Sequence, residues 1–154
     1  MAMEAHDFFG ANFISNGGLR ILGSDVNTDV LESANQGCYA DNFLSPIPDS
    51  FRRRYFTSES EKLNSHNQIK TEIQKLIQFR QFNLMSSDYP IATKFQLIFC
   101  RNVLYYLQPE KRDFLLRKLV DHLDEGGWLG LGITESGYII DKMEKHSISI
   151  YQKT

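Results

Sequence analysis

The clearest pattern along the chain is a run of apolar residues spaced three and four positions apart. Between Pro109 and Leu123, apolar side chains stand at positions 114, 115, 119, 120 and 123, and two glycines follow at 126 and 127. This spacing puts the apolar side chains on one face of a helix, and glycine is typical of the position just past a helix end. We therefore predict a helix over Pro109–Leu123.

Three shorter helices are predicted from weaker signals. Met1–Phe9 has a helical composition and precedes a glycine-containing break at positions 16–18. A helix from Val30 to about Asn35 follows Thr28-Asp29, whose side-chain oxygens can cap its first turn. Gly37 suits the left-handed conformation that ends many helices. The stretch Asp49–Phe56, which follows a proline-containing turn, is also predicted to be helical.

Five strands are predicted from shorter apolar runs. Leu19–Val26 and Phe95–Cys100 are nearly continuous, and the second is typical of an inner parallel strand covered on both faces. Leu76–Leu84, Trp128–Ile133 and Ser147–Tyr151 complete the set. Strands that alternate with helices indicate an α/β fold with a parallel sheet, in which ligands bind beyond the carboxyl ends of the strands.

Composition and charge exclude several classes of function. The 154 residues are 42% hydrophobic and 23% charged with a net charge of −2, so we expect one globular domain and no nucleic-acid partner. Cys38 and Cys100 lie far from each other and from any second ligand at metal-binding spacing, so we expect two reduced thiols and no metal. No run approaches about 20 apolar residues, and Met1–Asn12 does not resemble a secretory signal. We expect a cytoplasmic protein without membrane insertion.

Polar residues stand at or just past the ends of three of the predicted strands. They are Asp25, Asn83 and the pair Arg101-Asn102. Each alone has an ordinary structural interpretation as a cap or turn residue, but together they are expected to meet in one crevice. An ionised carboxylate such as that of Asp25 can accept both hydroxyls of a ribose, and the amide of Asn83 can read an adenine edge.

Seven short strings also stand in a recognisable order and spacing. They are LGSDVNTDVL at 22–31, GCY at 37–39, RYF at 54–56, IQFRQFNL at 77–84, FCRNVLYY at 99–106, GG at 126–127 and GITE at 132–135. In this order they resemble the chemotaxis receptor methyltransferase (CheR) family over most of the chain. The string beginning Phe-Cys-Arg-Asn-Val is the most specific, because generic methyltransferases share the fold and not that string.

The resemblance implies a Rossmann-like class I methyltransferase sheet, S-adenosyl-L-methionine as cofactor and S-adenosyl-L-homocysteine as product. It implies methyl-ester formation on glutamates in the cytoplasmic region of methyl-accepting chemotaxis receptors. It assigns the ribose to Asp25, the adenine to Asn83 and Leu84, the methionine portion or its neighbouring loop to Arg101 and Asn102, and the surroundings of the sulfonium to Tyr106. By residue type alone, Tyr106 is more typical of a core aromatic; the family context favours the catalytic site.

The chain also departs from the family pattern. The family's first strand and cofactor loop, with a Gly-Glu-Glu-Pro-Tyr-Ser type string, have no counterpart here, so we expect residues 1–154 to form an incomplete methyltransferase domain. The missing strand normally lies between those predicted at Leu19–Val26 and Phe95–Cys100, which should leave an open seam. A small inserted subdomain is expected at about 38–77. Its stretch Thr57–Asn67 is polar and lacks glycine, which argues against a bound tethering peptide.

Other functions remain open from the sequence. The chain could be a non-catalytic receptor- or partner-binding module derived from the same family. A nucleotide-dependent dehydrogenase is disfavoured, because no Gly-x-Gly-x-x-Gly turn follows a predicted strand. A monomer is expected.

Overall fold

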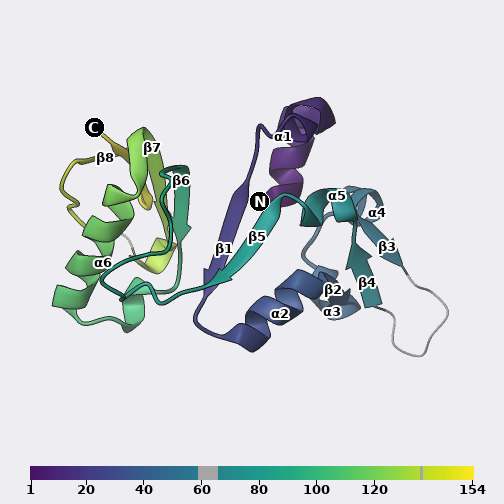
Figure 1. Cartoon of the computed structure of the whole chain (residues 1–154), viewed down its shortest axis with the longest axis horizontal. Helices are drawn as coiled ribbons and strands as arrows, with labels where there is room; N and C mark the ends of the chain where they lie inside the picture. Colours follow the sequence, from purple (N-terminus) through teal and green to yellow (C-terminus); the bar gives the residue numbers. More distant parts are fainter. Residues whose placement is uncertain (59–65, 136) are drawn as a thin grey trace. The chain divides into compact units, whose positions relative to one another are not determined.

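The computed structural model describes residues 1–58, 66–135 and 137–154 (Figure 1). They form two compact units, Met1–Asn83 and Leu84–Thr154, and each is described by itself. The polar stretch Thr57–Asn67 noted in the sequence falls largely on residues 59–65, which lie outside the described residues. The α/β class predicted from the sequence is confirmed, because parallel strand pairs and helices occur in both units.

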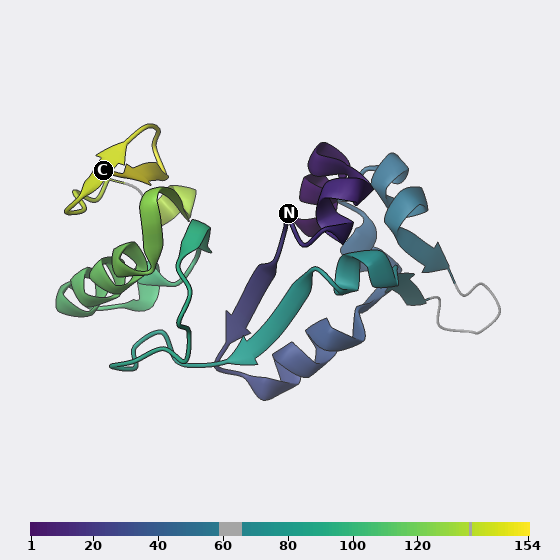
Figure 2. The same cartoon turned by 45° about the horizontal axis from the view of Figure 1, so that its top comes forward.

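The first unit is built around a parallel pair of strands, β1 (Ile21–Asp25) and β5 (Ile77–Gln81). Asp25 stands opposite Gln81 in the register, and Figures 1 and 2 both show the two strands side by side. Helix α2 (Thr28–Gln36) follows β1 and packs against both strands. Strand β5 ends earlier than the predicted Leu76–Leu84, so Asn83 stands two residues beyond it.

Helix α1 (Ala2–Ser15) extends past the predicted Met1–Phe9. Gly10 interrupts it with φ of 78° and ψ of 158°, and a second helical stretch follows. Glycine adopts this positive φ without the steric cost that a Cβ would bring. The predicted end at Phe9 therefore marks a kink, and the helix itself stops at the break around Gly17.

The two ends of α2 test the capping predictions separately. The N-cap is Asn27, whose side chain accepts the Asp29 N–H at 2.9 Å, so the predicted capping by Thr28-Asp29 is wrong. Asn27 is favoured there because it is in extended conformation just before the helix begins. The prediction for Gly37 is confirmed: it is the left-handed C-cap, with φ of 63°.

A three-stranded antiparallel sheet, in the order β2-β4-β3, lies within the range predicted for the inserted subdomain. Its elements are β2 (Cys38–Ala40), α3 (Asp41–Leu44), α4 (Asp49–Tyr55), β3 (Phe56–Ser58), β4 (His66–Ile69) and α5 (Thr71–Gln74). Tyr55, Ile69, Ile73 and Leu76 form its buried core. The helix predicted at Asp49–Phe56 is confirmed as α4, whereas the three strands stand where the sequence predicted only helix or loop.

The second unit contains a four-stranded sheet in the order β6-β7-β9-β8. Its elements are β6 (Phe95–Cys100), η1 (Leu104–Tyr106), α6 (Pro109–Asp121), β7 (Leu123–Leu131), η2 (Ile133–Glu135), β8 (Met143–Lys145) and β9 (Ile150–Lys153). β6 and β7 are parallel, and the other two pairs are antiparallel. β1 and β6 are the two strands expected to lie on either side of the missing first strand of the family. They belong to separate sheets.

Predictions for this unit are right for α6 and β6 and less accurate beyond them. β7 begins at Leu123 and carries Gly126 inside it, where the sequence predicted a strand from Trp128. β8 was not expected, because Asp141–His146 shows only a polar pattern; it forms by pairing with β9. β9 itself begins at Ile150, three residues later than the predicted start at Ser147.

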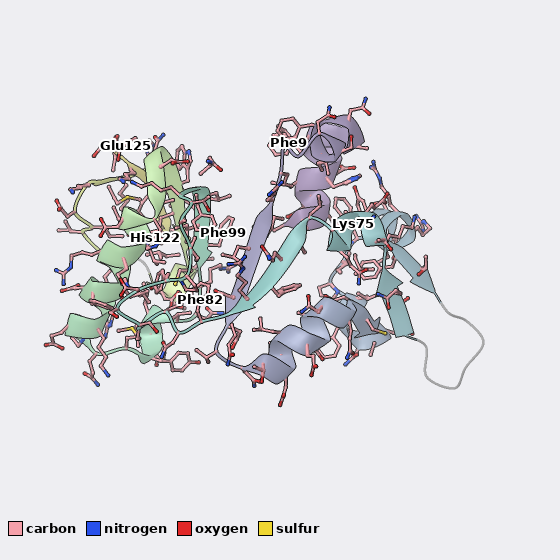
Figure 3. The ribbon with its side chains drawn as sticks, viewed as in Figure 1. Phe9, Lys75, Phe82, Phe99, His122 and Glu125 are labelled. Atoms are coloured by element: carbon pink, nitrogen blue, oxygen red, sulfur yellow. The ribbon has the colours of Figure 1, made fainter. Side chains whose placement is uncertain are left out.

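One face of the second unit's sheet packs against α6. Cys100 is buried there and Ile98 packs against the same core, together with leucines of α6 and β7. Leu97 and Phe99, which alternate with them, are 48% and 49% exposed, and Phe99 projects from β6 away from α6 (Figure 3). Within this unit, α6 covers one face of β6, and the described residues of the unit do not provide the cover that was expected on the other face.

Candidate functional site

The first candidate region is the carboxyl end of β1. Asp25 is exposed, and its Oδ1 accepts the backbone N–H of Asn27 at 2.9 Å. This local turn places Asn27 at the start of α2 and holds the Asp25 carboxylate at the strand end. A carboxylate has two oxygens and about four lone-pair sites, so it can accept further hydrogen bonds while keeping this one.

The end of β5 lies beside the end of β1. The backbone N–H of Phe82 donates to the Asp25 carbonyl at 3.3 Å, and the Gln81 side chain donates to the Val26 carbonyl at 2.9 Å. Asn83 follows directly and is exposed. The first unit thus brings Asp25 and Asn83 to the same edge of its parallel strand pair, the edge where α/β sheets bind ligands.

Leu84 opens the second unit and is partly buried. Its side chain packs against the unit's core, and its carbonyl accepts the hydroxyl of Tyr89. Burial, with a smaller contribution from Cys100, raises the pKa of Tyr89 to about 12, so this hydroxyl stays protonated and remains a donor. Lys118 of α6 also donates to the Ser86 carbonyl at 2.6 Å. The segment after Leu84 is therefore hydrogen-bonded to α6.

The second candidate region is the loop that follows β6. Arg101 and Asn102 are exposed directly after buried Cys100, and Asn102 has a left-handed φ of 59°. The turn η1 comes next and presents Tyr106 with 79% of its surface exposed. The Tyr105 and Tyr106 rings meet edge to face at 5.5 Å between centroids. The structure thus places Arg101, Asn102 and Tyr106 on one short loop.

Sequence analysis missed the residue that organises this loop, Glu135. Its side chain is 1% exposed, and it accepts backbone N–H groups of Asn102 at 2.7 Å, Tyr105 at 3.2 Å and Gly132 at 3.1 Å. Burial pushes the pKa of Glu135 upward, but these hydrogen bonds outweigh it and hold the pKa below its ordinary value. The carboxylate is therefore ionised at neutral pH.

The sequence does carry a signal for Glu135. The string Gly-Ile-Thr-Glu at 132–135 follows an apolar strand directly, where a carboxylate must be either solvated or paired. Two of its partners, the backbone N–H groups of Asn102 and Tyr105, lie 33 and 30 residues away, however, and no side-chain pattern marks them.

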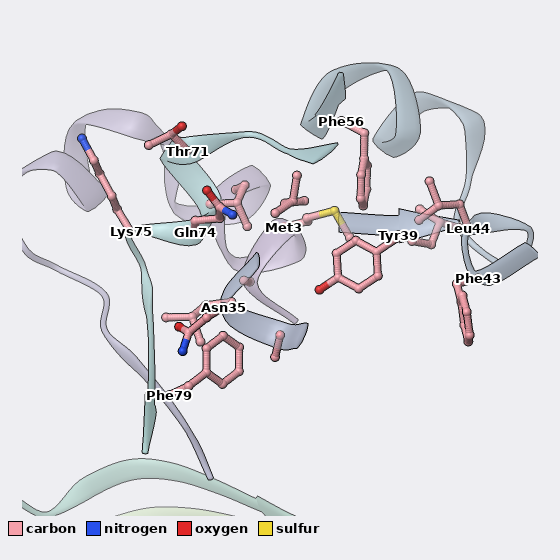
Figure 4. A pocket seen from close by; sticks show the side chains of 16 residues that line it. Met3, Asn35, Tyr39, Phe43, Leu44, Phe56, Thr71, Gln74, Lys75 and Phe79 are labelled. Carbon is pink, nitrogen blue, oxygen red and sulfur yellow. The ribbon is translucent and has the colours of Figure 1, made fainter. Parts of the chain in front are cut away.

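An apolar cavity of about 600 Å³ lies within the first unit (Figure 4). Aromatic and aliphatic side chains make up most of its wall, among them Tyr39, Phe56 and Phe79, and Gln74 and Lys75 add polar groups. Its size falls within the range of roughly 300 to 1,000 Å³ that is usual for small-molecule pockets. None of the six residues predicted to bind cofactor or act in catalysis lines it.

The described ranges contain neither a metal-ligand cluster nor a membrane-spanning helix. No group of three or more His, Cys, Asp or Glu side chains there is arranged to hold a metal ion. Nor do those ranges contain a helix with the length and apolar character needed to cross a membrane. Cys38 and Cys100 are free thiols, the first exposed and the second buried.

Comparisons with known proteins point to one family. The family model described as "CheR methyltransferase, SAM binding domain" matches residues 1–151. Chemotaxis protein methyltransferase 2 of Pseudomonas aeruginosa is 32% identical over 118 residues, which are 77% of this chain and 42% of that protein. The chemotaxis protein methyltransferase of Vibrio parahaemolyticus is 35% identical over 116 residues, 75% of this chain and 41% of its own length.

The chain therefore spans about two fifths of the length of these curated relatives. Among solved structures, the glycopeptide N-methyltransferase MtfA in complex with S-adenosyl-L-methionine aligns with 92% of this chain and 47% of its own. The identity is 15% and the TM-score 0.45, which is too distant a likeness to bear on function.

Proposed function

The chain belongs to the SAM-binding domain family of CheR methyltransferases, and on this premise we propose that it serves S-adenosyl-L-methionine-dependent methyl-ester formation on glutamates of chemotaxis receptors. The observation that carries the proposal is the position of Asp25, an exposed carboxylate at the carboxyl end of a parallel strand. Such a carboxylate suits the paired hydroxyls of a ribose.

The first unit would hold the nucleoside portion of the cofactor. Asp25 would accept hydrogen bonds from the ribose hydroxyls, and Asn83 offers both a donor and an acceptor to the adenine edge. Leu84 would contribute apolar contact to the adenine, although its packing against the second unit's core limits how far it can move. The exposure of Asp25 and Asn83 fits this role, since neither would need to leave a core to reach a ligand.

The loop after β6 would serve the methionine portion. Arg101 can pair with a carboxylate and Asn102 can hydrogen-bond an amino or carboxylate group. Tyr106 would lie near the sulfonium, because the face of an aromatic ring attracts a desolvated cation by roughly 0.5 to 2 kcal/mol. Its exposed ring is free of the core role that residue type alone would favour.

The bound cofactor would supply an electrophilic methyl group. A receptor glutamate, with a pKa near ~4.3, is already ionised at neutral pH and needs no general base. One of its oxygens would form a bond to the methyl carbon while the carbon–sulfur bond breaks and its electron pair passes to sulfur. The task of the protein's own residues is to align the two groups and to exclude water.

Substrate and location follow the same proposal. The partner would be the cytoplasmic region of a methyl-accepting chemotaxis receptor, and the chain would act in the cytoplasm as a monomer. The similarity to chemotaxis protein methyltransferases of Pseudomonas aeruginosa and Vibrio parahaemolyticus supports the receptor assignment. Nucleic acid is not proposed as a partner, given the net charge of −2.

Isothermal titration with S-adenosyl-L-methionine tests the proposal. We expect weaker binding than in a longer relative such as the Pseudomonas aeruginosa protein, and a further loss of about tenfold or more for Asp25→Asn, because a charge-assisted hydrogen bond contributes roughly 1.5 to 3 kcal/mol. Asn keeps an oxygen for the bond to the Asn27 N–H, so the local turn survives. Glu32→Gln, on the exposed surface of α2, is the matched control. Unchanged affinity for Asp25→Asn would sink the ribose assignment.

A second candidate is a non-catalytic module that binds a receptor or partner protein. The apolar cavity of the first unit favours it, because it offers a recognition site separate from Asp25 and Asn83. A receptor fragment that binds the chain while S-adenosyl-L-methionine gives no titration signal would support this candidate over the enzymatic one. Binding of both ligands would support the enzyme.

A further inference from the structure

Glu135 is a buried charge whose observed partners are backbone groups. Its Oε2 accepts from Asn102 at 2.7 Å and Gly132 at 3.1 Å, and its Oε1 accepts from Tyr105 at 3.2 Å. A buried carboxylate is costly unless its oxygens are hydrogen-bonded. Here the bonds come from the strand end before Glu135 and from the loop after β6, so one side chain ties two segments together.

The bonds fall on both halves of the loop. Asn102, at its start, has the left-handed φ of 59° that non-glycine residues adopt rarely, and its N–H points to the carboxylate. Tyr105, inside η1, donates to the other oxygen. The carboxylate thus holds the loop at two points on either side of Val103 and Leu104. Arg101, Asn102 and Tyr106 carry their side chains outward from this fastened backbone.

The strand end leaves room for this arrangement. A Cβ on Gly132 would stand 2.6 Å from Oε2 of Glu135 and 3.4 Å from the side-chain oxygen of Asn102. A contact of 2.6 Å is too short, so any residue other than glycine would push the carboxylate away from the N–H groups that bond to it. Gly132 and Glu135 therefore act together: the glycine, three positions before the carboxylate, leaves the space that the carboxylate occupies.

We propose that Glu135 is a positioning residue that sets the shape of the 101–106 loop and thereby the affinity for the methionine portion of the cofactor. The inference rests on the proposed function and deepens it. Glu135 is 1% exposed, so it acts through the loop backbone and not by touching a ligand. The groups that it positions are Arg101, Asn102 and Tyr106.

Three ligands separate positioning from general stability. Adenosine carries only the nucleoside portion, whereas S-adenosyl-L-methionine and S-adenosyl-L-homocysteine also carry the methionine portion. For Glu135→Gln we expect about tenfold weaker binding of the two larger ligands and less than about twofold change for adenosine. Asp25→Asn should weaken all three. Glu110→Gln, exposed at the start of α6, is the matched control and should change none.

The outcomes are distinct. Equal weakening of adenosine and S-adenosyl-L-methionine by Glu135→Gln would show a general loss of structure and overturn the positioning role, as would unchanged binding of all three ligands. A wild-type chain that binds none of them contradicts the proposed function itself.

Amide hydrogen exchange in the wild-type chain tests the hydrogen bonds of Glu135 without any variant. This matters if Glu135→Gln does not fold. The N–H groups of Asn102, Tyr105 and Gly132 should exchange at least about a hundredfold more slowly than in an unfolded chain, although Asn102 and Tyr105 are exposed residues. Unprotected exchange at Asn102 and Tyr105 would overturn the inference whatever the ligands do.

Discussion

The two candidate regions of the molecule are held in place in different ways. At the end of β1, Asp25 bonds to Asn27 and Asn27 bonds to Asp29, so each contact spans two residues. After β6, the loop is held by Glu135, which lies 33 residues from Asn102 and 30 from Tyr105. The local hydrogen bonds around Asp25 should survive small changes elsewhere in the chain. The long-range hydrogen bonds of Glu135 depend on the tertiary structure of the second unit.

This difference has an energetic side. The Asp25 carboxylate is exposed, so losing its bond to Asn27 lets water replace it. The Glu135 carboxylate is buried, and its removal leaves several backbone N–H groups without their acceptor. The two regions should therefore lose different amounts of stability when their contacts are removed.

Glu135→Ala should lower the free energy of unfolding by about 3 kcal/mol, because three buried or partly buried N–H groups lose their acceptor. Urea denaturation followed by circular dichroism measures it. Asp25→Ala, which removes an exposed carboxylate, should cost less than about 1 kcal/mol. Similar losses for the two variants would mean that the two regions are not held differently after all.

Gly132→Ala should cost about 2 kcal/mol, since its Cβ would stand 2.6 Å from the buried carboxylate oxygen. Thr134→Ala, on an exposed position of the same turn, is the control and should change little. Combining Gly132→Ala with Glu135→Ala should cost less than the sum of the single changes, because both act on one contact. Strict additivity in the double-mutant cycle would contradict a shared contact between Gly132 and Glu135.

Asn27→Ala should cost about 1 kcal/mol through loss of the N-cap of α2. Asn27→Ser keeps a capping oxygen and should stay close to wild type. Helical content and urea midpoints check both. An Asn27→Ala variant as stable as the wild type would show that the cap contributes little and that packing against β5 holds the helix.

The smallest expected effect is a dependence of stability on acid pH. Because the pKa of Glu135 is lowered in the folded chain, the stability it contributes is complete above the ordinary carboxyl pKa and is lost as pH falls through the folded pKa. Cys100 faces the same carboxylate, but its pKa is raised to about 11 by burial and by Glu135, so it stays neutral in this range.

Glu135→Gln should therefore show a flatter stability profile below pH ~4.5 than the wild type. Urea midpoints measured between neutral and acid pH, with Glu110→Gln as control, make the comparison. Parallel profiles for Glu135→Gln and wild type would mean that other carboxylates carry the acid dependence.

Much of the fold was predictable from the sequence where the signal is local. The apolar spacing of α6, the runs of β1 and β6 and the left-handed stop at Gly37 all depend on residues within a few positions. The predictions failed where pairing decides the outcome. β8 exists because β9 lies beside it, and β7 starts early because Leu123 pairs with Phe95.

The same distinction between local signals and tertiary pairing applies to the candidate site. Residue types at strand ends pointed to Asp25, Asn83 and the pair Arg101-Asn102, since a polar residue after an apolar run can be read without a structure. Tyr106 was indicated only by the family resemblance. Which of them share an edge depends on the register between β1 and β5.

By itself, the sequence determined the family, the main helices and strands, and the polar residues that end them, because these depend on local pattern and ordered strings. Only the tertiary structure decided that Glu135 is buried and that it holds the loop around Asn102. The physical reason is that its partners are backbone N–H groups, which every residue except proline carries and which no sequence pattern distinguishes.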